Sequence, residues 1–227
     1  MITGYFITGT DTDVGKTWAT IALMRYFKQQ GYSVVGMKPV AAGCTYASDV
    51  EHEGGEVLRN ADALLMQANA SIDVAYELVN PYAYSLPASP HIAGVDDPVN
   101  LAKVVSCFDT LKSLADIVLV EGVGGWYAPI NQQEDISDLA KKLALPIILV
   151  VGIKLGCINH AKLSYQVIQQ SGLECAGWIA ACIDGDMLFL EENIETIKAA
   201  LSVPLLGVLP YLPEADFDLL ADRIVFG

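Results

Sequence analysis

The sequence predicts an α/β protein with one doubly wound, mostly parallel sheet flanked by helices. Short apolar runs recur along the 227 residues, helix-period stretches lie between them, and we find neither an internal repeat nor a low-complexity tract. Continuous apolar strands suit a sheet that is covered on both faces. Alternating strands and helices favour parallel pairing, in which ligands collect at the carboxyl ends of the strands. We therefore expect the motifs that directly follow strands to carry the function.

The expected strands are short apolar runs, and the expected helices have apolar residues at helical spacing. The strands are placed at residues 5–8, 33–37, 117–120, 147–151, 177–181 and 205–208. The helices are placed at residues 17–30, 59–67, 98–114, 136–143, 158–170 and 187–201. Residues 44–97 break this alternation and hold an acidic patch made of Asp49, Glu51, Glu53 and Glu56. We interpret that stretch as a functional excursion from the fold rather than as a linker.

Length, composition and charge limit the classes of function. A chain of 227 residues with 53% hydrophobic and 18% charged residues suits a single compact domain over residues 1–227. The net charge of −14 disfavours nucleic acid and anionic membranes as partners, so a phosphate site must be local. The five cysteines form no C-x-x-C pair, and the start of the chain lacks a basic leader. We therefore expect a cytoplasmic protein.

A phosphate-binding loop is predicted directly after the first strand, in the sequence Gly9-Thr-Asp-Thr-Asp-Val-Gly15-Lys16-Thr17. In such loops, backbone N–H groups and a helix N-terminus converge on phosphate oxygens. The lysine neutralises the phosphate, and the hydroxyl can bind Mg²⁺. Five residues separate Gly9 from Gly15 where the usual motif has four, but the Gly-Lys-Thr order and the strand and helix around it still favour a nucleotide site. The alternative is a glycine-rich turn with a surface lysine.

Two further strand ends carry charged side chains. Lys38 follows the second expected strand, where a second lysine suits the charge of a transferred phosphoryl group. Glu121 follows the strand at residues 117–120, where a Walker-B-type carboxylate would hold Mg²⁺. The alternatives are a solvated lysine and a carboxylate that faces water. When only its neighbours in the sequence are considered, Asp62 near the start of the helix expected at residues 59–67 is a candidate N-cap of that helix.

The blocks GTDTDVGKT, KPVAAG and VEGVGGWYAPI together resemble the dethiobiotin synthetase family, as do residues 80–92 and 150–161. The resemblance implies a P-loop NTPase-type homodimer that binds 7,8-diaminononanoate, CO₂ or bicarbonate, and MgATP, and makes dethiobiotin for biotin biosynthesis. It implies that a substrate amine forms a carbamate and that ATP phosphorylates this carbamate. The neighbouring amine would then close the cyclic urea and expel phosphate, a reaction that mainly requires positioning and charge neutralisation.

The resemblance also implies roles for individual residues. The catalytic residues would be Lys16, on the ATP phosphates, and Lys38, on the carbamate and γ-phosphate, with Mg²⁺ bound by Thr17, Asp62 and Glu121. The nucleotide-binding residues would be Asp13, Val14, Gly15, Lys16, Thr17, Trp18, Asp62, Glu121, Gly122, Val123, Gly124, Ala181, Cys182, Pro210, Tyr211 and Leu212. The substrate-binding residues would be Thr12, Lys38, Ala42, Gly156, Cys157 and Asn159, the last three from the partner subunit. The substrate site would therefore lie at the dimer interface.

Two positions depart from the family pattern, and two other function classes share its motifs. Ala42 stands where the family commonly has a hydroxyl residue, and Ala181 stands where an Asn would recognise adenine. The other classes are a P-loop ligase that activates a different carboxylate or carbamate, and a partner-switching P-loop ATPase. Such switches usually carry an extra lysine early in the loop, where this chain has Thr10 to Asp13. Phosphate release that depends on diaminononanoate would discriminate among the three.

Overall fold

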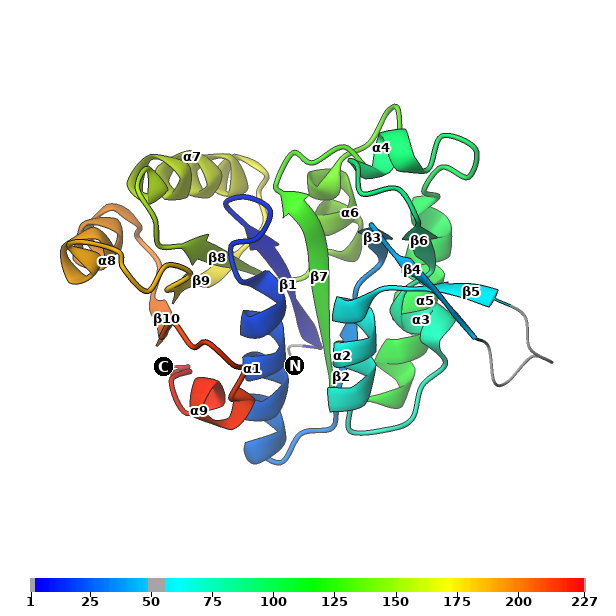
Figure 1. The fold of residues 1–227 in the computed structure, drawn as a ribbon, viewed down its shortest axis with the longest axis horizontal. Helices are drawn as coiled ribbons and strands as arrows, with labels where there is room; N and C mark the ends of the chain where they lie inside the picture. Colours follow the sequence, from blue (N-terminus) through cyan, green and yellow to red (C-terminus); the bar gives the residue numbers. More distant parts are fainter. Residues whose placement is uncertain (1–2, 49–55, 227) are drawn as a thin grey trace.

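The computed structural model describes residues 3–48 and 56–226 and is built around a six-stranded sheet (Figure 1). Every neighbouring pair in this sheet is parallel, and the strand order is β10-β9-β8-β1-β7-β2. The strands are β1 (Gly4–Gly9), β2 (Val34–Met37), β7 (Ile117–Gly125), β8 (Ile147–Gly152), β9 (Cys175–Ala181) and β10 (Leu205–Leu209). The chain adds β2 and β7 on one side of β1 and the later strands on the other. A crevice for ligands is expected at such a reversal of strand order.

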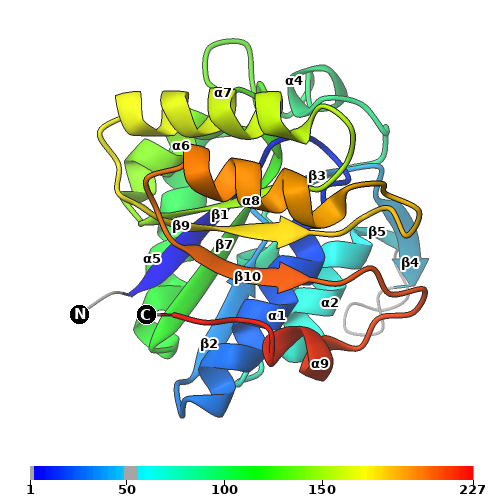
Figure 2. The same ribbon diagram turned by 90° about the vertical axis from the view of Figure 1, so that its left-hand side faces the viewer.

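Helices cover both faces of the sheet. One face carries α1 (Lys16–Gln29), α2 (Ala61–Asn69) and α9 (Phe217–Ala221), and α1 contacts both of the others. The other face carries α5 (Leu101–Leu114), α6 (Ile136–Leu143), α7 (Cys157–Gln170) and α8 (Leu190–Ala200). Figure 2 shows α7 and α8 on one side of β9 and β10, with α1 and α9 on the other. Because both faces are covered, all residues of β1 and of β8 are buried.

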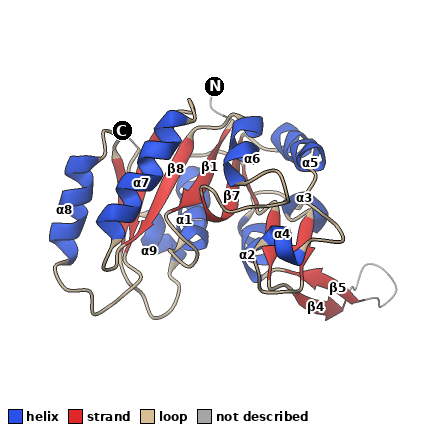
Figure 3. Ribbon diagram, turned by 90° about the horizontal axis from the view of Figure 1, so that it is seen from above, coloured by secondary structure: helices blue, strands red, loops and turns tan. Residues whose placement is uncertain are grey.

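The stretch between β2 and α5 forms short elements of its own. They are β3 (Val40–Ala42), β4 (Thr45–Ser48), β5 (Glu56–Arg59), α3 (Tyr76–Val79), β6 (Tyr82–Tyr84) and α4 (Pro90–Ala93). β3 pairs with β6 and β4 pairs with β5, and the second pair lies at the opposite end of the molecule from α8 (Figure 3). Asp49, Glu51 and Glu53 of the acidic patch lie outside the described residues, and Glu56 begins β5.

The predicted strands and helices are present, with changes at their ends. β7 continues to Gly125, past the expected end at residue 120, and its Glu121 lies opposite Ile7 of β1. The helix expected at residues 59–67 is α2, which begins after Asn60. Within the described part of the chain, no helix combines the length and the apolar character needed to cross a membrane.

Candidate active site

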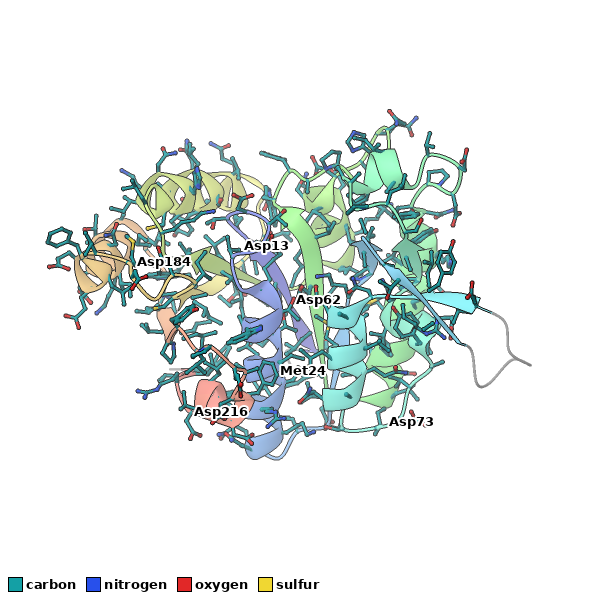
Figure 4. All side chains as sticks on the ribbon, in the orientation of Figure 1. Asp13, Met24, Asp62, Asp73, Asp184 and Asp216 are labelled. Carbon is teal, nitrogen blue, oxygen red and sulfur yellow. The ribbon has the colours of Figure 1, made fainter. Side chains whose placement is uncertain are left out.

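A cleft of about 490 Å³ lies at the carboxyl ends of the strands around β1, between the starts of α1 and α2. Figure 4 shows Asp13, before α1, and Asp62, in the first turn of α2, two of the residues that border it. The predicted site residues that line the cleft are Thr12, Asp13, Gly15, Lys16, Thr17, Trp18, Lys38, Ala42, Asp62, Glu121, Val123, Gly124, Ala181, Cys182, Pro210, Tyr211 and Leu212. The fold thus brings together residues that are far apart in the sequence.

The loop between β1 and α1 places the helix N-terminus at the cleft. Gly15 is the N-cap of α1 and has a φ of 85°, a left-handed conformation that favours glycine. A Cβ atom at this position would lie 3.0 Å from the Cβ of Ala181, so the loop also packs closely against the end of β9. No side chain caps α1. The first backbone N–H groups of the helix are therefore suited to bind an anion in the cleft.

Lys16 is buried within this loop, and its Nζ donates a hydrogen bond to the backbone oxygen of Asp11 at 2.6 Å. Burial lowers the pKa of Lys16 to about 8, although the Glu121 carboxylate opposes this shift. The positive charge of Lys38 lowers the same pKa further. An anion in the cleft would favour the charged form of Lys16.

Glu121 is a carboxylate with no exposed surface at the centre of the site. Its Oε1 accepts hydrogen bonds from Thr17 Oγ1 at 2.9 Å and from Lys38 Nζ at 2.5 Å. Its Oε2 accepts a hydrogen bond from Thr20 Oγ1 at 2.8 Å. These three donors satisfy a charge that would be costly to bury alone.

Lys38, which is 6% exposed, lies between two carboxylates from different elements. Its Nζ is 2.8 Å from Asp62 Oδ2 and also contacts Glu121. Burial disfavours the charged form of Lys38, but the carboxylates of Glu121 and Asp62 outweigh this effect and raise the pKa above that of an ordinary lysine.

The N-cap of α2 is Asn60 and not Asp62. The Asn60 side chain accepts the N–H of Ala63, so the interpretation of Asp62 as the cap is wrong. The Asp62 carboxylate instead pairs with Lys38.

The chemistry of these oxygen donors fits a magnesium ion. Thr17, Asp62 and Glu121 offer a hydroxyl and two carboxylates, and the ammonium of Lys38 already places a positive charge between the carboxylates. Within residues 3–48 and 56–226, no three His, Cys, Asp or Glu side chains form a metal cluster. A metal ion at this position would therefore need phosphate oxygens and water as further ligands, which is the usual coordination of Mg²⁺.

Five predicted site residues do not line the cleft. Val14 and Gly122 are buried beside it. Gly156, Cys157 and Asn159 lie at the start of α7. The Cys157 side chain is buried and its Sγ contacts Asn193 Oδ1 at 3.7 Å, whereas Gly156 and Asn159 are exposed. One chain therefore does not gather all of the predicted substrate-binding residues in one cleft.

The part of the cleft formed by the ends of β9 and β10 is mainly apolar. Trp18, Ala181, Ile183 and Leu212 line it, and the ring of Trp18 packs edge-on against Phe217 of α9 at 5.9 Å. Ala181 has no side-chain group that could hydrogen-bond to a nucleotide base. Discrimination between bases at this position would rest on backbone groups and on neighbouring side chains.

Sequence reasoning missed three polar residues around the cleft. Thr20 binds Glu121, and it is a fully buried hydroxyl on the otherwise apolar inner face of α1. Asn60 lines the cleft as well as capping α2. Lys154 Nζ lies 3.5 Å from Asp11 Oδ2 in the phosphate-binding loop. The polar position of Thr20 within an apolar helical stripe was the one signal that the sequence offered.

Comparison with known proteins gives close relatives and more distant fold neighbours. Residues 3–217 match the family model described as an AAA domain. The ATP-dependent dethiobiotin synthetase BioD of Aromatoleum aromaticum is 44% identical over 214 residues, which are 93% of this chain and 92% of that protein. The ATP-dependent dethiobiotin synthetase BioD of Cellvibrio japonicus is 44% identical over 217 residues, which are 94% of this chain and 92% of that protein.

Two solved structures share the fold at low sequence identity. The MinC:MinD cell division protein complex of Aquifex aeolicus aligns with a TM-score of 0.58 and 17% identity, over 96% of this chain and 84% of that chain. A ParA family ATPase from Chlorobium tepidum aligns with a TM-score of 0.53 and 12% identity, over 92% of this chain and 85% of that chain. These likenesses concern the fold alone, and they confirm the predicted P-loop NTPase type of α/β fold.

Proposed function

The chain belongs to the family of ATP-dependent dethiobiotin synthetases, and on that basis we propose that it is an ATP-dependent ligase that forms dethiobiotin in biotin biosynthesis. Its substrates are 7,8-diaminononanoate, CO₂ and ATP. The single observation of the site that carries the proposal is the contact of Lys38 Nζ with both Glu121 and Asp62 beside the phosphate-binding loop. This arrangement places a fixed positive charge where a transferred phosphoryl group would need it.

The residues of the chain divide the work of binding and orienting the reactants. Lys16 and the first amides of α1 bind the ATP phosphates. Lys38 binds the carbamate and the γ-phosphate and neutralises the charge that develops between them. Thr17, Asp62 and Glu121 hold Mg²⁺, which supplies additional charge neutralisation on the phosphate oxygens when bound.

The proposed reaction proceeds in three steps. One substrate amine adds to CO₂ and loses a proton, which gives a carbamate. A carbamate oxygen attacks the γ-phosphorus of ATP and releases ADP, which gives a mixed anhydride. The second amine then attacks the carbamoyl carbon, loses a proton and expels phosphate, which closes the cyclic urea. Each step mainly requires that the reacting groups are held in place.

The proposal includes a homodimer in which the start of α7 from one subunit binds the substrate carboxylate at the cleft of the other. Gly156 is the N-cap of α7 with a φ of 92°, and no side chain caps this helix. Gly156 and Asn159 are exposed, and the neighbouring Leu155 is 93% exposed. The uncapped amides of α7 are therefore accessible to an anionic group of a ligand shared with a second molecule, which supports the proposal. The strands of the one six-stranded sheet lie between residue 4 and residue 209 of the chain, which supports the proposal that each chain forms one domain.

The test is phosphate release by the purified protein with MgATP and bicarbonate, with and without 7,8-diaminononanoate. We expect strong stimulation by the diamine and one dethiobiotin formed per phosphate released. A repeat with CTP and GTP would rank the nucleotides, because Ala181 offers no side-chain hydrogen bond to the base. The Lys16→Ala variant is the control for a contaminating ATPase. If the diamine stimulates phosphate release with none of these nucleotides, the proposal is contradicted.

A further inference from the structure

Two buried residues that do not line the cleft, Tyr76 and Asn80, connect Lys38 to the start of α2. The Asn80 side-chain amide donates hydrogen bonds from Nδ2 to the backbone oxygens of Lys38 at 2.6 Å and Tyr82 at 3.1 Å. Its Oδ1 accepts a hydrogen bond from the Tyr76 hydroxyl at 2.9 Å. That hydroxyl in turn accepts the backbone N–H of Asn60 at 2.8 Å.

We call this chain of hydrogen bonds through Tyr76 and Asn80 the bridge. The chemistry of each hydrogen-bond partner fixes the orientation of the side chains in the bridge. The two backbone oxygens can only accept, so Nδ2 must face them and Oδ1 must face Tyr76. The Asn60 N–H can only donate, so the Tyr76 oxygen accepts there and its hydrogen is directed to Asn80. Tyr76 is 7% exposed and Asn80 is 4% exposed. A buried polar group that lost its partner here would be costly, which keeps the bridge intact.

The bridge closes a ring that passes through the active site. The bridge starts at the backbone of Lys38 and ends at Asn60. The Lys38 N–H also donates a hydrogen bond to Val79 O at 2.8 Å. Asn60 is the N-cap of α2, and the first turn of that helix carries Asp62. The ring is completed where Asp62 Oδ2 meets Lys38 Nζ at 2.8 Å. The distance between the Lys38 backbone and the α2 N-terminus therefore sets where this ion pair forms.

We propose that Tyr76 and Asn80 are positioning residues, whose bridge holds Lys38 against Asp62 and Glu121 for phosphoryl transfer and keeps Asp62 in place for Mg²⁺. Neither residue touches the reactants, and both act through the two segments that they join. The assignment to phosphoryl transfer rests on the proposed function. The effect on Mg²⁺ binding is measured without the diamine, so it is tested separately.

The chain offers a matched control for Tyr76 in Tyr82. The Tyr82 hydroxyl accepts the backbone N–H of Asn100 at 2.9 Å, and Asn100 is the N-cap of α5. Tyr82 is 4% exposed, and Lys103 Nζ lies over its ring at 4.5 Å, just as the Arg59 guanidinium lies over the Tyr76 ring at 4.1 Å. Tyr76→Phe and Tyr82→Phe thus remove the same kind of hydroxyl at a helix start, but α5 carries no residue of the cleft.

The experiment compares the two phenylalanine variants with the wild-type protein. For Tyr76→Phe we expect kcat for phosphate release to fall and the half-saturating Mg²⁺ concentration to rise, each about 10- to 100-fold, as for other residues that orient metal ligands. KM for ATP stays within about threefold because the phosphate-binding loop is unchanged. For Tyr82→Phe, kcat and the Mg²⁺ requirement stay within about twofold. Both variants should lose thermal stability to a similar extent.

A second readout needs no turnover: the rise in unfolding temperature as Mg²⁺ is added to the protein in saturating ADP, whose phosphate oxygens complete the metal site. Tyr76→Phe should require more Mg²⁺ for half of the rise than Tyr82→Phe. Equal Mg²⁺ requirements in the two variants would overturn the proposal. If the wild-type protein shows no diamine-dependent release, the proposed function fails, while this titration still tests the bridge.

A double-mutant cycle distinguishes one bridge from two separate contacts. Asn80→Leu has a similar size but cannot donate to Lys38 O, so it should raise the Mg²⁺ requirement in the same way as Tyr76→Phe. Because both residues act through one chain of hydrogen bonds, the double variant should be no worse than Asn80→Leu alone. Additive losses from the two substitutions would overturn the proposal.

Discussion

The two lysines of the site differ in what their ammonium groups contact. Lys16 Nζ donates to a backbone oxygen of its own loop, whereas Lys38 Nζ lies between two carboxylates. A phosphate oxygen can replace the backbone contact of Lys16 without separating an ion pair. Lys38 keeps negative partners even before a nucleotide binds. This difference supports the proposed roles, in which Lys16 mainly binds the nucleotide and Lys38 mainly serves phosphoryl transfer.

Substitution of each lysine tests this division. Lys16→Ala should weaken ATP binding about 10- to 100-fold, because a charged hydrogen-bond donor is lost. Lys38→Ala should leave the ATP dissociation constant within about threefold and lower the single-turnover rate about 100- to 1,000-fold, as for other donors that stabilise a transition state. Calorimetry and rapid-quench measurements give the two quantities. Equal losses of binding in both variants would contradict the assignment.

The pKa of Lys16 predicts proton uptake when a nucleotide binds. In the free protein, burial holds this pKa at about 8, so at pH 9 most Lys16 side chains are neutral. Phosphate oxygens favour the ammonium form and raise the pKa, so binding at pH 9 should take up nearly one proton. Calorimetry with metal-free ADP in buffers of different ionisation enthalpy measures this number. Lys16→Arg, which stays charged, should show no uptake. Wild-type binding at pH 9 without proton uptake would contradict this prediction.

At the scale of elements, the position of α2 depends on Gly36 of β2. A Cβ atom at Gly36 would lie 2.8 Å from the Met66 Cβ and 3.0 Å from the Met24 Sδ. The glycine therefore lets α2 and α1 approach the sheet closely. α2 carries Asp62 and β2 leads directly to Lys38, so this close packing brings the two charged groups together.

Gly36→Ala should displace α2 from the sheet. We expect the free energy of unfolding to fall by about 1 to 3 kcal/mol through overpacking, together with a higher Mg²⁺ requirement because Asp62 moves with the helix. Urea denaturation and the Mg²⁺ titration measure these effects. Leu64→Ala, on the half-exposed outer face of α2, is the control and should change the Mg²⁺ requirement little. An unchanged Mg²⁺ requirement in Gly36→Ala would contradict this prediction, because it would show that the packing of α2 does not control the position of Asp62.

An element could be predicted from the sequence where the interactions that form it lie within a short segment of the chain. α6 has the predicted bounds, because Asp135 and Asp138 form a capping box directly before its apolar face. β3 and β6 were not predicted, because each has three residues and their pairing joins Val40 to Tyr82 across the chain. Lys16 and Thr17 follow from the loop motif. Asp62 required the family resemblance, and the Tyr76 bridge required the structure, because neither has a local signal.

At the scale of the whole molecule, the fold and the chemistry have different sources. The fold is shared with proteins of 12–17% identity, so the fold alone does not specify the reaction. Of the groups around Lys38, Glu121 comes from β7, whereas Asp62 and its positioning residues come from the stretch between β2 and α5. The start of α7 lies outside the cleft of its own chain. In the proposed function, a second copy of the chain would complete the substrate site.

Mixed dimers test whether the site is shared between subunits. Lys16→Ala inactivates the cleft of its own chain, and Asn159→Asp places a negative charge where α7 would receive the substrate carboxylate. Each variant alone should show little activity. After the subunits exchange, half of the dimers contain both chains and each has one intact site, so activity should recover to about a quarter of wild type. Size-exclusion chromatography confirms that both variants remain dimers. If each chain held a complete site, every site in the mixture would be damaged and no activity would return.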